Sequence, residues 1–204
     1  MSMSGSLSRQ LIWIPILHTQ ADLGSLSKSV QEAFVRRLGQ AEWDLHQRRI
    51  EGMWDEIRRL IGLMNLDYSR VRLYQDGLPI CGQEEQIVRD LAKAGSRNHS
   101  LLLEMMEKGA LLTGTESPQL LVEEYQLAGK TLQGVEAGSR SARLARAQQV
   151  LGKRLLERRD TFIAERINQT LEPGFTGQVY LGRLHNLAGK LAPDIQLHRL
   201  EVSV

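Results

Sequence analysis

Short apolar runs alternate with long amphipathic segments along this chain of 204 residues. The first run, residues 9–18, is continuously apolar and rich in β-branched and aromatic side chains, which is typical of a strand covered on both faces. Pro15 within it indicates a bulge or a position away from the centre of a sheet. Four further strands are predicted, the last at the edge of the sheet: 70–75, 110–113, 176–182 and 195–202.

Helices are predicted between these strands from apolar residues spaced three to five positions apart. The longest segment covers residues 30–64, with a break expected near Gly52. A second long helix is expected to end at Leu171, after a glycine- and serine-rich loop over residues 129–141. Shorter helices are predicted over 83–94, 98–108 and from Pro118 onward. The alternation predicts an α/β fold whose sheet is mainly parallel, has four or five strands and is flanked by long helices.

The length and composition fit one domain of ordinary size. Hydrophobic residues make up 42% and charged residues 25% of the chain, which excludes a disordered or coiled-coil protein. We expect a flexible tail over residues 1–10 and a single α/β domain over 11–204. The apolar run at 11–17 is too short to cross a membrane, and the single Cys81 cannot form an internal disulfide, so we expect a cytoplasmic protein without membrane contact.

The net charge of +2 is small, but basic residues are concentrated in one predicted helix. Residues 140–166 contain eight Lys and Arg against three Asp and Glu, a local charge of +5. Such a stripe could bind phosphates or an acidic partner. Aromatic residues make up only 5% of the chain and no nucleic-acid motif is present, so we expect a solvated or internally paired face and no nucleic-acid partner. The long helices also leave room for a homodimer.

Polar residues follow each predicted strand, where ligands of parallel sheets bind. His18 and Asp22 follow the first strand, Asp76 the second, Glu116 the third and His185 the fourth. Two imidazoles and up to three carboxylates at one edge would suit a divalent metal ion or an acid/base pair. The plainer interpretation is that such loops are polar in any protein. We expect the other histidines to be surface or internally hydrogen-bonded groups: His46, His99 and His198.

Four short patches resemble the TraB/PrgY/GumN group, which is usually placed with erythromycin esterases and ChaN-like haem-binding proteins. That group has a histidine after the first strand, a glutamate after a central strand, a helix of the form R-[ND]-x3-A and a late Gly-x-x-His. The helix element resembles Arg159 to Ala164, and the last element matches Gly182 to His185. One departure is Pro15-Ile16-Leu17 before His18, where the group usually has Gly-Thr, and the chain is shorter than a full-length member.

The resemblance implies metal-assisted or acid/base hydrolysis of a small anionic substrate. A divalent metal would be held by His18, Glu116 and His185, and would lower the pKa of a bound water to about 7. Catalytic roles would fall to Glu116, His185 and Asp22, and the substrate would meet Arg159, Arg166 and Asp76. The alternative is a noncatalytic ligand-binding or signalling module on the same scaffold.

Overall fold

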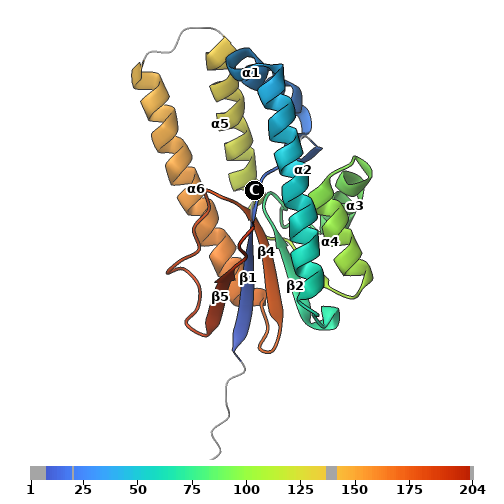
Figure 1. Ribbon diagram of the computed structural model, residues 1–204. Helices are drawn as coiled ribbons and strands as arrows, with labels where there is room; N and C mark the ends of the chain where they lie inside the picture. Colours follow the sequence, from blue (N-terminus) through green and yellow to red (C-terminus); the bar gives the residue numbers. More distant parts are fainter. Residues whose placement is uncertain (1–7, 20, 137–141, 203–204) are drawn as a thin grey trace, which may run out of the picture.

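The computed structural model describes residues 8–19, 21–136 and 142–202 (Figure 1). Five strands form one sheet in the order β3-β2-β4-β1-β5, and every neighbouring pair is parallel. The predicted α/β class and mainly parallel sheet are therefore confirmed. The strands are β1 (Arg9–Ile16), β2 (Val71–Gln75), β3 (Leu111–Thr113), β4 (Thr176–Gly182) and β5 (Ile195–Arg199).

Helices connect the strands and cover both faces of the sheet. The α-helices are α1 (Ser27–Leu38), α2 (Gln40–Leu63), α3 (Glu84–Lys93), α4 (Arg97–Glu107), α5 (Pro118–Glu136) and α6 (Ala142–Thr170). Two short 3-10 helices, η1 (Ala21–Leu26) and η2 (Tyr68–Arg70), precede α1 and β2. None of the helices in the described part of the chain is both long and apolar enough to span a membrane.

Some predicted boundaries were wrong, one because of local backbone conformation and one because of packing between helices. The first long helix breaks at Gly39, whose φ of 92° only glycine adopts readily, and not near Gly52. The loop expected over 129–141 is helical as far as Glu136, because α5 packs along α6 and this packing outweighs the low helix propensity of glycine. The remaining residues of that loop, 137–141, lie outside the described residues, as do residues 1–7 of the expected tail.

The strands also end differently from the prediction. β1 begins at Arg9, inside the expected tail, and β5 ends at Arg199 rather than at Val202. Pro15 lies inside β1 without a bulge. β5 pairs with β1 only as far as Trp13, so beyond that point β1 is paired with β4 alone, and the missing N–H of Pro15 costs no hydrogen bond to β5.

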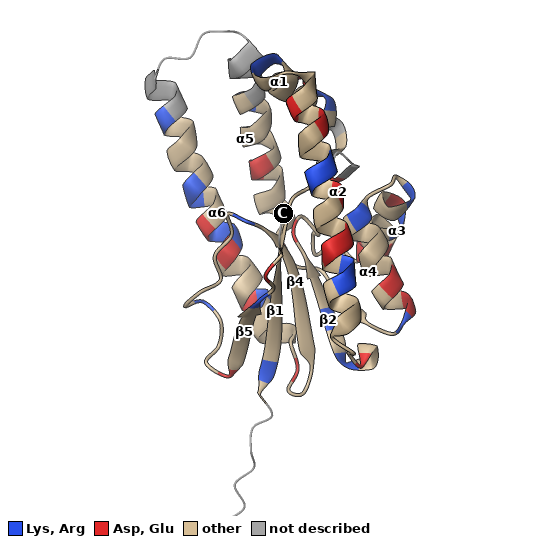
Figure 2. Cartoon of the chain, in the orientation of Figure 1, with Lys and Arg blue, Asp and Glu red and all other residues tan. Residues whose placement is uncertain are grey.

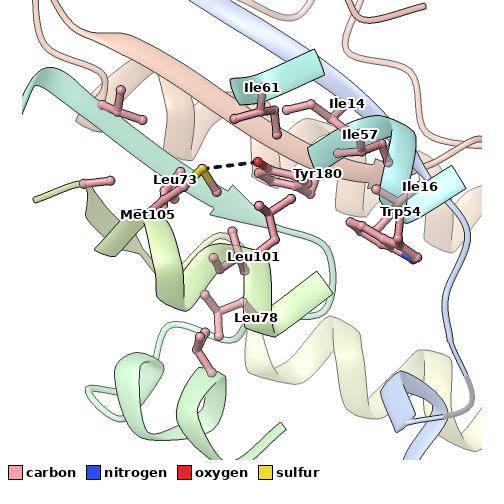
Figure 3. Packing of buried hydrophobic residues seen from close by; sticks show 14 of the residues in the cluster. Ile14, Ile16, Trp54, Ile57, Ile61, Leu73, Leu78, Leu101, Met105 and Tyr180 are labelled. Carbon is pink, nitrogen blue, oxygen red and sulfur yellow. Dashed lines mark hydrogen bonds between the residues drawn. The ribbon is translucent and has the colours of Figure 1, made fainter. Parts of the chain in front are cut away.

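Two apolar cores hold the layers together, one on each face of the sheet. On one face, Ile14, Ile16 and Tyr180 pack against Trp54 and Ile57 of α2, and α4 completes this core (Figure 3). The opposite core joins the sheet to α6: Leu11, Trp13, Val179, Leu181, Ile163 and Ile167. Alternating residues of β1 and β4 thus face opposite cores, which explains why these strands read as continuously apolar.

The carboxyl ends of the strands meet at one edge of the sheet, beyond which α1, α5 and part of α6 project (Figure 1). His18, Asp76, Glu116 and His185 all follow a strand at this edge. The fold therefore places chemically reactive side chains from four separate segments in one region.

Candidate functional site

Asp76, directly after β2, lies at the centre of the polar cluster at this edge. Its Oδ2 accepts a hydrogen bond from the backbone N–H of Gly182 at 2.9 Å. The same oxygen lies 3.3 Å from Nε2 of His18 and 3.4 Å from Nε2 of His185. The Asp76 side chain is only 6% exposed. One buried carboxylate oxygen therefore faces two imidazoles, one after β1 and one after β4. We call these three side chains, with Arg159 and Glu116 beside them, the centre.

His185 lies between two carboxylates. Its Nδ1 is 2.6 Å from Oδ1 of Asp160 on α6, and Oδ2 of Asp160 accepts from the backbone N–H of Asn186 at 3.0 Å. Burial lowers the pKa of His185, but the hydrogen bonds to Asp160 and Asp76 outweigh it and raise the pKa to about 9. His185 is therefore an imidazolium at neutral pH, donating from both ring nitrogens.

His18 is the exposed member of the pair, with 36% of its side chain accessible. Burial of the ring opposes protonation, whereas the hydrogen bond and charge of Asp76 favour it, and the net result is a raised pKa. The next residue, Thr19, lines an open groove of about 530 Å³, together with residues that include Gln47 and Arg97. His18 is thus the centre's contact with the solvent.

Arg159 closes the cluster from α6 and is 4% exposed. Its Nε and Nη2 donate to the two oxygens of Glu116 at 2.7 and 2.5 Å, and Nη2 also donates to Oδ1 of Asp76 at 2.6 Å. Nη1 donates to Glu124 of α5. The guanidinium is therefore occupied by three carboxylates of its own chain and is not placed to receive an anionic substrate, the role implied for it by the sequence resemblance.

The two buried carboxylates beside Arg159 have pKa values that are shifted in opposite directions. Burial raises the pKa of Asp76, but the hydrogen bonds from His18 and His185 hold it well below its ordinary value. Burial and the negative charge of Asp76 raise the pKa of Glu116, although Arg159 and the N–H of Gly77 oppose the rise. Asp76 is thus the permanent anion of the centre.

The expected metal ligands do not form a ligand set. Within residues 8–19, 21–136 and 142–202, no group of three or more His, Cys, Asp or Glu side chains could hold a metal ion. Both oxygens of Glu116 face Arg159, while His18 and His185 face Asp76. The residues implied as metal ligands therefore do not fit the ion.

Two other expected site residues lie outside the centre. Asp22 belongs to a neighbouring cluster, where its Oδ1 accepts from Ser96 Oγ at 2.5 Å and its Oδ2 accepts from the Thr19 N–H at 2.7 Å. Arg166 donates from Nε to the backbone carbonyl of Gly114 at 3.0 Å, beyond the end of β3. Neither contacts Asp76 directly in the described structure.

Gly182 gives the centre its close packing. A Cβ at this position would lie 3.2 Å from Oδ2 of Asp76, 3.7 Å from Cδ2 of His185 and 4.0 Å from Nε2 of His18. The absent side chain therefore leaves the space into which all three groups point. This is the physical role of the glycine in the Gly-x-x-His pattern of this sequence.

No role was expected for Asp160 or Glu124, although Asp160 occupies the second position of the R-[ND]-x3-A pattern. Asp160 falls on the buried stripe of α6, four residues before Ala164 and seven before Ile167, so a charged residue there had to find a buried partner. The position of Asp160 on the buried stripe could therefore have identified it. Glu124 is 46% exposed, and nothing in the sequence pattern distinguishes it from other surface residues.

The basic stripe of α6 is partly internal, as expected for a paired face. Arg159 is buried in the centre, and Arg158 pairs with Glu123 of α5 at 2.6 Å. Lys153 and Arg154 remain exposed. Lys and Arg alternate with acidic residues along the lower part of this helix (Figure 2), and Arg140 lies outside the described residues.

Comparisons with protein-family models, curated proteins and solved structures gave no match.

Proposed function

We propose that this chain is an acid–base hydrolase in which His18 takes a proton from the attacking water. One observation carries the proposal: the Nε2 atoms of His18 and His185 both lie within 3.4 Å of one oxygen of Asp76. Of these three side chains, only His18 is substantially exposed. A titratable group held by a buried carboxylate at an open surface is the arrangement that general-base catalysis requires.

Asp76 orients His18. A neutral His18 donates from Nε2 to Oδ2 of Asp76, which leaves Nδ1 as the ring nitrogen that accepts a proton. Once protonated, the imidazolium is stabilised by the charge of Asp76, in agreement with the raised pKa of His18. The carboxylate thus fixes the tautomer and favours the proton transfer.

His185 and Arg159 keep Asp76 ionised. Both donate to its carboxylate, His185 to Oδ2 and Arg159 to Oδ1. Because the pKa of His185 is about 9, its positive charge persists at neutral pH. The two cations stabilise the negative charge of Asp76, which remains able to accept from His18.

The reaction follows from these roles. Water gives one proton to His18 Nδ1 as its oxygen bonds to the electrophilic atom of the substrate, and His18 returns that proton to the leaving group as the scissile bond breaks. No redox partner is needed, and His18 ends each cycle neutral. The groove of about 530 Å³ beside Thr19 has room for a small substrate.

The expectation of an anionic substrate depended on Arg159 and Arg166. Carboxylates of the same chain occupy Arg159, and Arg166 donates from Nε to the Gly114 carbonyl. A screen should therefore contain matched pairs of small neutral and anionic esters. We expect turnover by the natural protein, and a loss of kcat/KM of about 10²- to 10⁴-fold in His18→Gln. His198→Gln is the control, because His198 is an exposed residue of β5 that faces Gln10.

Two outcomes decide against this assignment. Full activity in folded His18→Gln would remove the proposed base. A ligand-induced rise in melting temperature without turnover of any ester would favour the noncatalytic binding module instead. The pH dependence is a further check, since kcat/KM should rise with pH as His18 loses its proton.

A further inference from the structure

A second histidine–carboxylate cluster lies beside the proposed centre, formed by Asp22, Ser96 and His99. Ser96 Oγ is 2.5 Å from Oδ1 of Asp22 and 2.7 Å from Nδ1 of His99, and that Nδ1 is 3.2 Å from the same Asp22 oxygen. Ser96 is fully buried and His99 is 5% exposed. The serine hydroxyl is closed off from solvent, so the cluster is not a nucleophilic site.

The second carboxylate oxygen of Asp22, Oδ2, binds the chain segment that contains His18. Oδ2 of Asp22 accepts from the backbone N–H of Thr19 at 2.7 Å and from its hydroxyl at 2.8 Å. Thr19 is bonded directly to His18. Burial raises the pKa of Asp22, but the hydrogen bonds from His99, Ser96 and Thr19 outweigh it and lower the pKa. Asp22 is thus a carboxylate with donors on both oxygens.

The other side of the cluster is anchored in the core. Ser96 is the N-cap of α4, where its Oγ accepts from the backbone N–H of His99 at 3.2 Å. Leu101, Leu102 and Met105 of the same helix are buried against the sheet. The contacts therefore form a chain from a packed helix through Ser96 and Asp22 to the backbone next to His18.

We propose that Ser96 and His99 are positioning residues that hold His18 against Asp76 through Asp22 and Thr19. An effect of Ser96 and His99 on catalysis rests on the proposed function, in which His18 is the base. The positioning itself is a property of the protein without substrate, so it can be measured independently.

The protonation of His18 reports its position. Asp76 after β2 and Asp22 both favour its charged form, while Arg159 of α6 and burial oppose it. Ser96→Ala leaves all three of these charges in place. A change in the His18 pKa in that variant therefore measures movement of the ring relative to Asp76.

The experiment is an NMR titration of the five histidines, with the His18 signal assigned by its loss in His18→Gln. In Ser96→Ala we expect the His18 pKa to fall towards 6.5 and hydrogen exchange of the Thr19 amide to become at least about tenfold faster. Ser100→Ala is the matched control, because Ser100 Oγ donates to the Ser96 carbonyl at 2.8 Å, on the same helix. It should change neither quantity.

Thr19→Val is the second variant, in case Ser96→Ala does not fold. It removes one of the two hydrogen bonds to Asp22 at a partly exposed residue, and we expect a smaller fall in the same pKa. Unchanged His18 pKa values in the folded variants would overturn the positioning role. That failure is distinct from failure of the proposed function, which is tested by the loss of ester turnover in His18→Gln.

Discussion

Two buried arginines, at opposite edges of the sheet, show how position decides the use of a charge. At the amino edge, Arg9 donates to both oxygens of Asp194 at 2.7 and 2.8 Å, and its Nη1 donates to the carbonyls of Asn168 and Leu171. These carbonyls lie at the end of α6, so Arg9 caps that helix and ties it to β1.

At the carboxyl edge, Arg159 donates only to carboxylates, and one of these faces two histidines. Proton gain or loss by either histidine therefore changes the charge balance around Arg159. Arg9 is held by two backbone carbonyls and by Asp194, whose pKa the Arg9 hydrogen bond lowers, so its partners do not titrate above neutral pH. The comparison indicates a structural clamp at one edge and a titratable centre at the other.

The largest effect is expected for Arg159→Met. It leaves Glu116 and Asp76 buried without their main cation, which typically costs about 3–5 kcal/mol of unfolding free energy. Arg9→Met leaves a carboxylate that is 43% exposed and can be solvated, so a smaller loss of about 1–3 kcal/mol is expected. Urea unfolding of both variants measures the difference, and an equal or larger loss for Arg9→Met would contradict the distinction.

The next largest effect is a dependence of the unfolding free energy on pH, which arises at the carboxyl edge of the sheet. The pKa of His185 is about 9 in the folded protein and 6.5 in the unfolded chain. The protonated form of His185 therefore stabilises the fold. This stabilisation, on the order of 3 kcal/mol, is present in full below pH 6.5 and is lost as the pH rises through about 9.

The unfolding free energies of the natural protein and of His185→Gln, measured from pH 6 to pH 10, test this directly. We expect the gap between the two to narrow with rising pH. In Arg9→Met the gap to the natural protein should stay constant over the same range. A pH-independent gap for His185→Gln would mean that the histidine is held as a neutral ring.

The smallest effect on stability is expected at Gly182. In Gly182→Ala the new Cβ displaces the Asp76 carboxylate by a few tenths of an ångström, so the His18 and His185 pKa values should fall while stability changes by less than about 1 kcal/mol. Gly177, at the amino end of the same strand, is the control. A Cβ there would lie 2.8 Å from Leu11 Cδ1, so Gly177→Ala should cost about 1–3 kcal/mol.

NMR titration of the two alanine variants distinguishes the effect of a substitution at the carboxyl edge from one at the amino edge. Gly177→Ala should leave the histidine pKa values unchanged, because its contacts are with apolar side chains. If Gly182→Ala also leaves them unchanged, the close approach of Asp76 to the two rings has no electrostatic consequence.

The sequence predicted the sheet well because its strands are buried on both faces. Ile14 and Ile16 face one core while Leu11 and Trp13 face the other, and this produces the continuous apolar run that indicates a parallel sheet. The convergence of polar groups at the carboxyl edge follows from that topology. Helix boundaries were harder, because the break at Gly39 and the continuation of α5 through Gly129 depend on local backbone conformation and on packing against α6.

The roles at the edge could be predicted only in part. Arg159 is spaced four residues from both Leu155 and Ile163, on the buried stripe of α6, so a paired and inaccessible arginine could have been inferred from periodicity. Which partners it takes could not, since Glu116 and Asp76 arrive from distant segments. The choice of Asp76, rather than Glu116, as the partner of both histidines is likewise a result of tertiary packing.

The most direct test of the titratable centre is an NMR titration of all five histidines in the natural protein and in Asp76→Asn. We expect His18 and His185 both to titrate above 6.5 in the natural protein, with His185 near 9, and both pKa values to fall when the charge of Asp76 is removed. His198, which faces Gln10 on the exposed edge strand, should not change. If the pKa values of His18 and His185 are the same in Asp76→Asn as in the natural protein, Asp76 is not the group that holds their charge.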